Sequence, residues 1–163
     1  MKFEIKHRYS GEVLFALETE SLKWCLEAAV KSSSNLRGSN LSGSDLSGSN
    51  IEAAKNADLI IAQTSILVEG DIIGYKKLSC GAIAKLLIPK EAKRSNATGR
   101  KCRAEYADVL EVIDADEGVS SHDDCFIYKA GQRVTPDSWD EDRWNECSSG
   151  IHFFITKIEA ENY

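Results

Sequence analysis

Residues 34–49 read SNLRGSNLSGSDLSGS, and a leucine recurs in this stretch every five residues. The leucines are Leu36, Leu41 and Leu46, and Ile51 continues the spacing. A period of five is neither the 3.6 of an α-helix nor the 2 of a flat strand. Small residues between the leucines allow the backbone to turn corners. The spacing therefore predicts a coil whose leucines point inward.

The repeat unit, Ser-(Asn/Asp)-Leu-x-Gly, resembles that of the pentapeptide-repeat family. Serine stands where that family usually has alanine or cysteine, whereas the (Asn/Asp)-Leu core is kept, as in Asn35-Leu36 and Asp45-Leu46. The resemblance implies that residues 34–62 form one short coil of a right-handed β-helix. One coil cannot bury its own leucines, so it needs cover from neighbouring elements or from a second chain.

The segments on either side of the repeat carry ordinary periodicities. Alternating apolar residues over residues 3–8 and 12–18 predict a β-hairpin, and the spacing over residues 22–30 predicts a helix. Residues 65–163 hold several short alternating segments, and a capping box at Thr156 predicts a last helix. The sequence thus predicts an α+β protein, with a hairpin and helix over 1–33, the repeat over 34–62, and an α+β domain with a mainly antiparallel sheet over 65–163.

The composition narrows the range of functions. A net charge of −6 argues against general nucleic-acid binding. The sequence contains no run of 18 apolar residues, so no membrane span is predicted. The N-terminal residues do not resemble a signal peptide, and the five cysteines show no close spacing pattern. These two observations predict reduced thiols and a cytoplasmic protein. No cofactor or metal is predicted, although the loose spacing of His122, Cys125, Cys147 and His152 leaves zinc open.

A basic stretch over residues 85–103 is followed by an acidic one. These charges either pair across the surface or form an anion pocket, because arginine suits bidentate recognition of phosphate. The tryptophans of SWDEDRWNEC, residues 138–147, either cap the core or offer a stacking face for a base or a cation. The candidate ligand-binding residues are Arg94, Arg100, Lys101, Arg103, Trp139, Arg143, Trp144, His152 and Tyr163.

The last residues, CSSGIHFFITKIEAENY, resemble the strand–helix segment of the ADP-ribosyltransferase fold. Residues 150–153 correspond to a Gly-Ile-Tyr-Phe strand, and Asn162-Tyr163 to the end of the following helix. The resemblance implies that His152 replaces a tyrosine that packs against nicotinamide, and that Tyr163 faces the pocket. The family's earlier histidine or arginine motif and its catalytic glutamate have no counterpart here. No catalytic residue is therefore predicted, and the resemblance implies recognition of an ADP-ribose-like ligand without turnover.

The order of segments, from KFEIKHRYSGEVLFALE to IAKLLIP and DRWNECSSGIHFF, resembles phage and prophage pentapeptide-repeat proteins whose C-terminal domain has no assigned function. We interpret the chain as a non-enzymatic binding protein for a small anionic nucleotide-type ligand, in the cytoplasm of a bacterial host. It would be a homo-oligomeric phage sponge that sequesters an ADP-ribose-like or cyclic nucleotide immune signal. Two alternatives are a module that inhibits a host protein, and a transferase or hydrolase acting on nucleotides.

Overall fold

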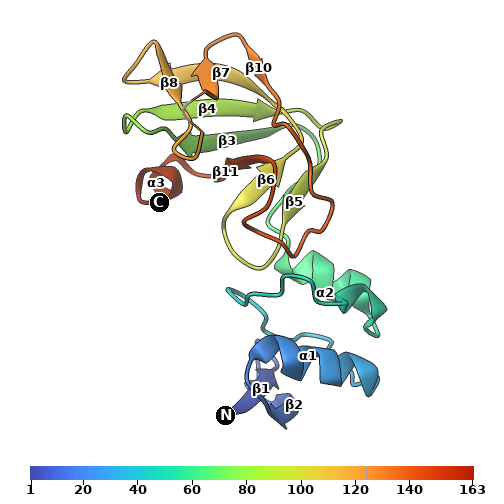
Figure 1. Ribbon diagram of the computed structural model, residues 1–163. Helices are drawn as coiled ribbons and strands as arrows, with labels where there is room; N and C mark the ends of the chain where they lie inside the picture. The colour runs from blue at the N-terminus through green and yellow to red at the C-terminus, as the bar shows by residue number, and fades with distance from the viewer. Residues whose placement is uncertain (124) are drawn as a thin grey trace. The chain divides into compact units, whose positions relative to one another are not determined.

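The computed structural model describes residues 1–123 and 125–163 (Figure 1). The chain divides into two compact units. Unit 1 consists of Met1–Ser65 together with Ala97–Gly99, and unit 2 consists of Ile66–Asn96 and Arg100–Tyr163. Each unit is described below by itself.

Unit 1 begins with the predicted hairpin and helix. Strands β1 (Lys2–Lys6) and β2 (Val13–Glu18) pair antiparallel, and α1 (Leu22–Lys31) follows. The hydroxyl of Ser21 accepts a hydrogen bond from the Trp24 N–H and so caps the helix. Helix α1 packs against both strands. The alternation and the helical spacing read from the sequence therefore correspond to elements of the structure.

The repeat does not form a coil of right-handed β-helix, and that prediction is wrong. Between residues 34 and 50 the described backbone makes successive turns and no strand. In each turn a leucine or isoleucine carbonyl accepts a hydrogen bond from the N–H three residues later, as in Ser39 N to Leu36 O at 3.0 Å and Ser49 N to Leu46 O at 3.0 Å. The physical reason is that a single coil has no second coil with which its backbone can pair, so no ladder of strands forms.

The five-residue spacing still directs its apolar side chains inward. The side chains of Leu36, Leu41, Leu46 and Ile51 are all fully buried. Within unit 1, α1 and α2 (Ala57–Thr64) both pack against the 3₁₀ helix η1 (Ile51–Ala53) that ends the repeat. Helices of the same chain therefore help to cover the apolar side chains of the repeat.

Unit 2 is built from antiparallel strands in three sheets, which Figure 1 shows from green to red. The four-stranded sheet has the order β10 (Arg133–Val134), β7 (Ala107–Ile113), β4 (Ile83–Ile88), β3 (Ile72–Lys77). The three-stranded sheet has the order β11 (Ile151–Phe153), β6 (Cys102–Ala104), β5 (Arg94–Asn96). The third sheet pairs β8 (Glu117–Val119) with β9 (Ile127–Lys129).

The α+β class predicted for residues 65–163 is also wrong. Among the described residues of unit 2 the one helix is α3 (Lys157–Glu161), which packs against β3 and β4. It opens with the predicted capping box between Thr156 and Glu159. The other apolar segments of this unit have the period of strands, so a helix forms only where the sequence carries a strong start signal.

A close approach between β3 and β11 brings two sheets of unit 2 together. Tyr75 and Phe154 exchange two backbone hydrogen bonds of 2.8 Å across this contact. A Cβ at Gly74 would lie 2.5 Å from the Phe153 ring, so the approach requires glycine at this position. The same alternation directs the side chains of Ile72, Lys76 and Leu78 inward along with Gly74.

Candidate functional site

Unit 2 contains a cavity of about 500 Å³. Its walls come from β3, β9, β11, residues 120–123 and 126, the loop around residues 136–150, and the segments before β6 and after α3. Its lining includes basic, aromatic and thiol side chains, namely Lys76, Lys101, His122, Phe126, Tyr128, Cys147, His152 and Tyr163. Small-molecule sites in proteins have volumes of about 300–1,000 Å³, so this cavity is large enough to hold a ligand.

Lys76 is the most unusual residue of the cavity. Its side chain occupies an inward position of β3 and the residue is only 9% exposed. Across residues 1–123 and 125–163 its ammonium forms no ion pair, and its Nζ lies 5.8 Å from the centroid of the Tyr128 ring. Burial, and then the positive charge of Lys101, lower the pKa of Lys76 from 10.5 to about 8. A buried cation is therefore present at neutral pH without a carboxylate from the described chain.

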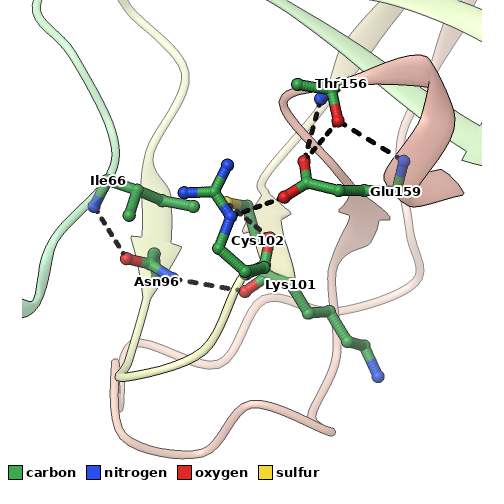
Figure 2. Close-up of polar contacts among 7 residues, drawn as sticks. Ile66, Asn96, Lys101, Cys102, Thr156 and Glu159 are labelled. Atoms are coloured by element: carbon green, nitrogen blue, oxygen red, sulfur yellow. Dashed lines mark hydrogen bonds and ion pairs between the residues drawn. The ribbon is translucent and has the colours of Figure 1, made fainter. Parts of the chain in front are cut away.

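Lys101 reaches the same cavity from the start of β6. The side chain of Asn96 fixes its backbone by accepting a hydrogen bond from the Ile66 N–H and donating one to the Lys101 carbonyl (Figure 2). Figure 2 shows the Lys101 side chain extending away from these contacts. Its Nζ donates to Tyr163 Oη at 3.0 Å and lies 3.6 Å from Cys147 Sγ. Two ammonium groups thus line one cavity.

The Tyr163 side of the cavity is held in place by α3. Arg100 forms an ion pair of 2.5 Å with Glu159. Glu159 also completes the capping box with Thr156 (Figure 2). The ring of Tyr163 packs on that of Phe154, with 5.0 Å between centroids. Arg100 therefore acts on the site through the position of the helix.

His152 on β11 lines the cavity as a neutral imidazole. Because a carbonyl oxygen can only accept, His152 Nε2 donates the 2.8 Å hydrogen bond to Ser148 O, and Nδ1 carries the lone pair. Burial lowers the pKa of His152 to about 4 against the opposing effect of that hydrogen bond, and the charges of Lys101 and Lys76 add to the lowering. The ring adds no positive charge to the cavity at pH 7.

We expect His152 to make the protein less stable in acid. Its folded pKa of about 4 lies below the ordinary histidine pKa of 6.5, so the unfolded chain binds the proton first as the pH falls. The free energy of unfolding should drop by about 2 kcal/mol between pH 6.5 and 4 from this residue alone. Urea titrations of the wild type and of His152→Gln, whose amide can still donate to Ser148 O, measure this difference. Parallel pH profiles for the two proteins would contradict it.

Residues 62–160 match the profile of DUF5758, a family of unknown function. The chain belongs to this family. The matched DUF5758 region spans most of unit 2, including Lys76, Lys101 and His152. No curated protein and no solved structure matches the chain. Within the part of the chain that the structure describes, no helix of this DUF5758 protein is long and apolar enough to cross a membrane.

The structure places Arg103, a predicted ligand-binding residue, in the interior of the DUF5758 region. It is 1% exposed. Its guanidinium donates to the carbonyls of Asp140, Asp142 and Ser149 at 3.1, 2.7 and 2.6 Å, and lies 5.1 Å from the Trp139 ring centroid. These contacts hold the loop over residues 140–149, which forms part of the cavity wall. The structure therefore gives Arg103 a positioning role.

Gly150 follows this loop and leads into β11. Its backbone φ of +147° lies in a region that residues other than glycine rarely adopt. A Cβ at this position would lie 3.2 Å from both Arg103 Cβ and the Trp139 ring. The glycine lets the cavity wall pass close to the buried arginine. The loop, Arg103 and Trp139 consequently pack as one group beneath the cavity.

Of the predicted ligand-binding residues, Lys101, His152 and Tyr163 line the cavity. The others make contacts within unit 2. Trp144 is 1% exposed and packs under the Arg143 guanidinium, which donates to Asn96 O. Arg94 donates to Gly70 O at 2.7 Å. The structure therefore favours the interpretation that Trp144 belongs to the core.

Lys76 was not among the residues predicted from the sequence. The sequence did contain an indication of its burial. Lys76 lies at an even-numbered position of β3, as do the inward residues Ile72 and Gly74, and Leu78 continues this phase. A lysine in the apolar phase of a strand is rare enough to mark a candidate site.

The possibility of a zinc site left open by the sequence finds no support in the geometry. His122, Cys147 and His152 line the cavity, yet no group of three potential metal ligands gathers anywhere among residues 1–123 and 125–163. All five cysteines are unpaired. The chemistry of the cavity therefore rests on its lysines, its imidazoles and its aromatic rings.

Proposed function

We propose that the cavity of unit 2 binds a small anionic ligand of nucleotide type. The observation that carries this proposal is the Lys76 ammonium, which is buried beside a second ammonium and forms no ion pair within the described chain. An unpaired buried charge is costly, and perturbed groups in cavities are concentrated at functional sites. A phosphate accepting hydrogen bonds from Lys76 and Lys101 would remove that cost through charge-assisted hydrogen bonds.

The other residues of the cavity suit a nucleoside. Phe126 and Tyr128 lie in its wall with ring centroids 5.4 Å apart, and Tyr163 adds a third aromatic ring. Such rings provide apolar faces for a base. Asp123 and Asp137 also line the cavity and are exposed. Their carboxylates can accept hydrogen bonds from sugar hydroxyls and disfavour more highly charged polyanions.

Sequestration of the ligand is the activity that we propose, in preference to inhibition of a host protein. The latter alternative depended on an acidic surface with exposed tryptophans, two of which were expected in residues 138–147. Trp144 is buried, and the Trp139 ring carries the Arg103 guanidinium on one face. These two indoles consequently offer little surface as anchors for a protein partner.

We expect the purified protein to retain one nucleotide-type ligand per chain in native mass spectrometry. The panel contains AMP, NAD, ADP-ribose, cyclic ADP-ribose isomers and cyclic dinucleotides. Lys76→Met should weaken binding at least about tenfold, because it removes a charge-assisted hydrogen bond of about 1.5–3 kcal/mol.

The matched control for this variant is Lys77→Met, which changes the adjacent residue of β3, whose Nζ donates to Glu161 O instead. We expect the control to bind like the wild type. Equal affinities of the Lys76→Met variant and the wild type, or no retained ligand from the whole panel, would refute the proposed site.

A further inference from the structure

The environment of Lys76 is also one that activates an amine as a nucleophile. Lysines become nucleophilic at neutral pH when they are desolvated or lie beside another cation. Lys76 meets both conditions, because it is 9% exposed and the positive charge of Lys101 acts on it. In addition, the described chain provides no carboxylate that pairs with it and holds its proton.

We propose that Lys76 Nζ forms a reversible Schiff base with an anionic aldehyde or ketone bound in the 500 Å³ cavity. This inference rests on the proposed function, because it requires an anionic ligand in the same cavity. In the covalent state Lys101 alone would hold the anionic group, and the fraction of Lys76 that has lost its proton would meet the carbonyl carbon. Within the nucleotide class, the carbonyl is that of a phosphorylated reducing sugar in its open-chain form. Covalent capture of this kind would lengthen the residence of a sequestered ligand without consuming it.

The reaction requires no oxidant, reductant or further co-reactant. The neutral Lys76 amine forms a bond from Nζ to the carbonyl carbon as the carbon–oxygen π bond breaks. The oxygen takes up one of the two amine protons to give a carbinolamine. That hydroxyl then leaves as water, carrying the second amine proton, and a carbon–nitrogen double bond forms. Addition of water reverses the sequence and releases the ligand unchanged.

Buried uncharged groups and one cation face Lys76 from the surrounding elements and favour its neutral form. Tyr128 on β9 and His152 on β11 are uncharged at pH 7, since burial raises the pKa of the Tyr128 hydroxyl and lowers that of the His152 imidazole. Lys101 before β6 adds a positive charge, and Tyr163 after α3 engages Lys101. The loops contribute His122, Cys147 and the carboxylates of Asp123 and Asp137. These two carboxylates favour the charged form instead, but both are exposed, so solvent screens their effect.

The test uses the wild-type chain and pyridoxal 5′-phosphate, an anionic aldehyde, followed by reduction with borohydride and peptide mapping. We expect Lys76 to be labelled about tenfold or more faster than Lys77 at pH 7.5, since its pKa of about 8 leaves a substantial fraction of the Lys76 amine neutral. Its labelling rate should level off near pH 8, while the rates of exposed lysines continue to rise. Lys76→Met should remove this fast phase, and Lys77→Met should keep it.

Labelling of Lys76 no faster than that of Lys77, or fast labelling at Lys101 instead, would overturn the inference. Competition by AMP separates the two proposals. Fast labelling of Lys76 that AMP does not slow would support the Schiff base and count against nucleotide binding. AMP binding at the cavity without fast labelling of Lys76 would support nucleotide binding and count against the Schiff base.

Discussion

The Lys76→Met variant is expected to be more stable than the wild type at pH 7, by about 2 kcal/mol in the free energy of unfolding. Methionine has nearly the same length and an apolar end, so it fills the inward position of β3 without a buried charge. The wild type carries that cost because Lys76 is protonated, at 9% exposure, beside Lys101. Greater stability accompanied by loss of ligand binding is the pattern of a residue retained for function.

The pH dependence of this effect has a defined sign. The folded pKa of Lys76 is about 8, and the ordinary lysine pKa is 10.5. Between these values the unfolded chain keeps a proton that the folded chain has lost, so wild-type stability should rise with pH across this window. The rise should be absent in Lys76→Met and present in Lys77→Met. Urea titrations at several pH values measure it, and a Lys76→Met protein less stable than the wild type at pH 7 would contradict the account.

Replacement of Arg103 is expected to cost at least about 3 kcal/mol of folding free energy. Arg103→Met would leave the carbonyls of Asp140, Asp142 and Ser149 without their donor, in a region that is otherwise packed. It would also remove the guanidinium from the Trp139 ring. The loop that forms part of the cavity wall should then lose its order, and ligand binding should fall as a consequence.

Arg100→Met is the appropriate comparison for that variant. Arg100 makes an exposed ion pair with Glu159, and surface pairs of this kind contribute about 0–1 kcal/mol. Denaturant unfolding of both variants, with Trp fluorescence as the probe, measures the difference. If Arg103→Met unfolds like the wild type but loses the ligand, then Arg103 contacts the ligand directly and the positioning role is wrong.

The local elements of this protein could be predicted from its sequence because their signals are local. The alternation around Tyr9, the spacing within residues 22–31 and the capping box at Thr156 each depend on residues close in the chain. The repeat shows where such reasoning ends. Its spacing correctly directed Leu36 and Leu46 inward, but a β-helix also requires a neighbouring coil, which the described residues do not form.

The site was only partly predictable, for a physical reason. Lys101, His152 and Tyr163 could be selected by their residue types and by the pattern of the last strand and helix. Arg103 has the same residue type as a phosphate ligand, but its partners are backbone carbonyls more than thirty positions away, which no pattern of side chains reveals. Lys76 stands outside the dense basic stretch, and its importance follows from burial.

Measurement of the Lys76 pKa by NMR tests the account most directly, with ¹³C- and ¹⁵N-labelled lysine and assignment by comparison with Lys76→Met. The account predicts a pKa of about 8 in the free protein, and an increase when a phosphate-bearing ligand enters the cavity. Lys77 provides an internal reference on the same strand. A Lys76 pKa near 10.5 in the free protein would mean that its charge is already compensated, and the cavity would then lack the feature on which both proposals rest.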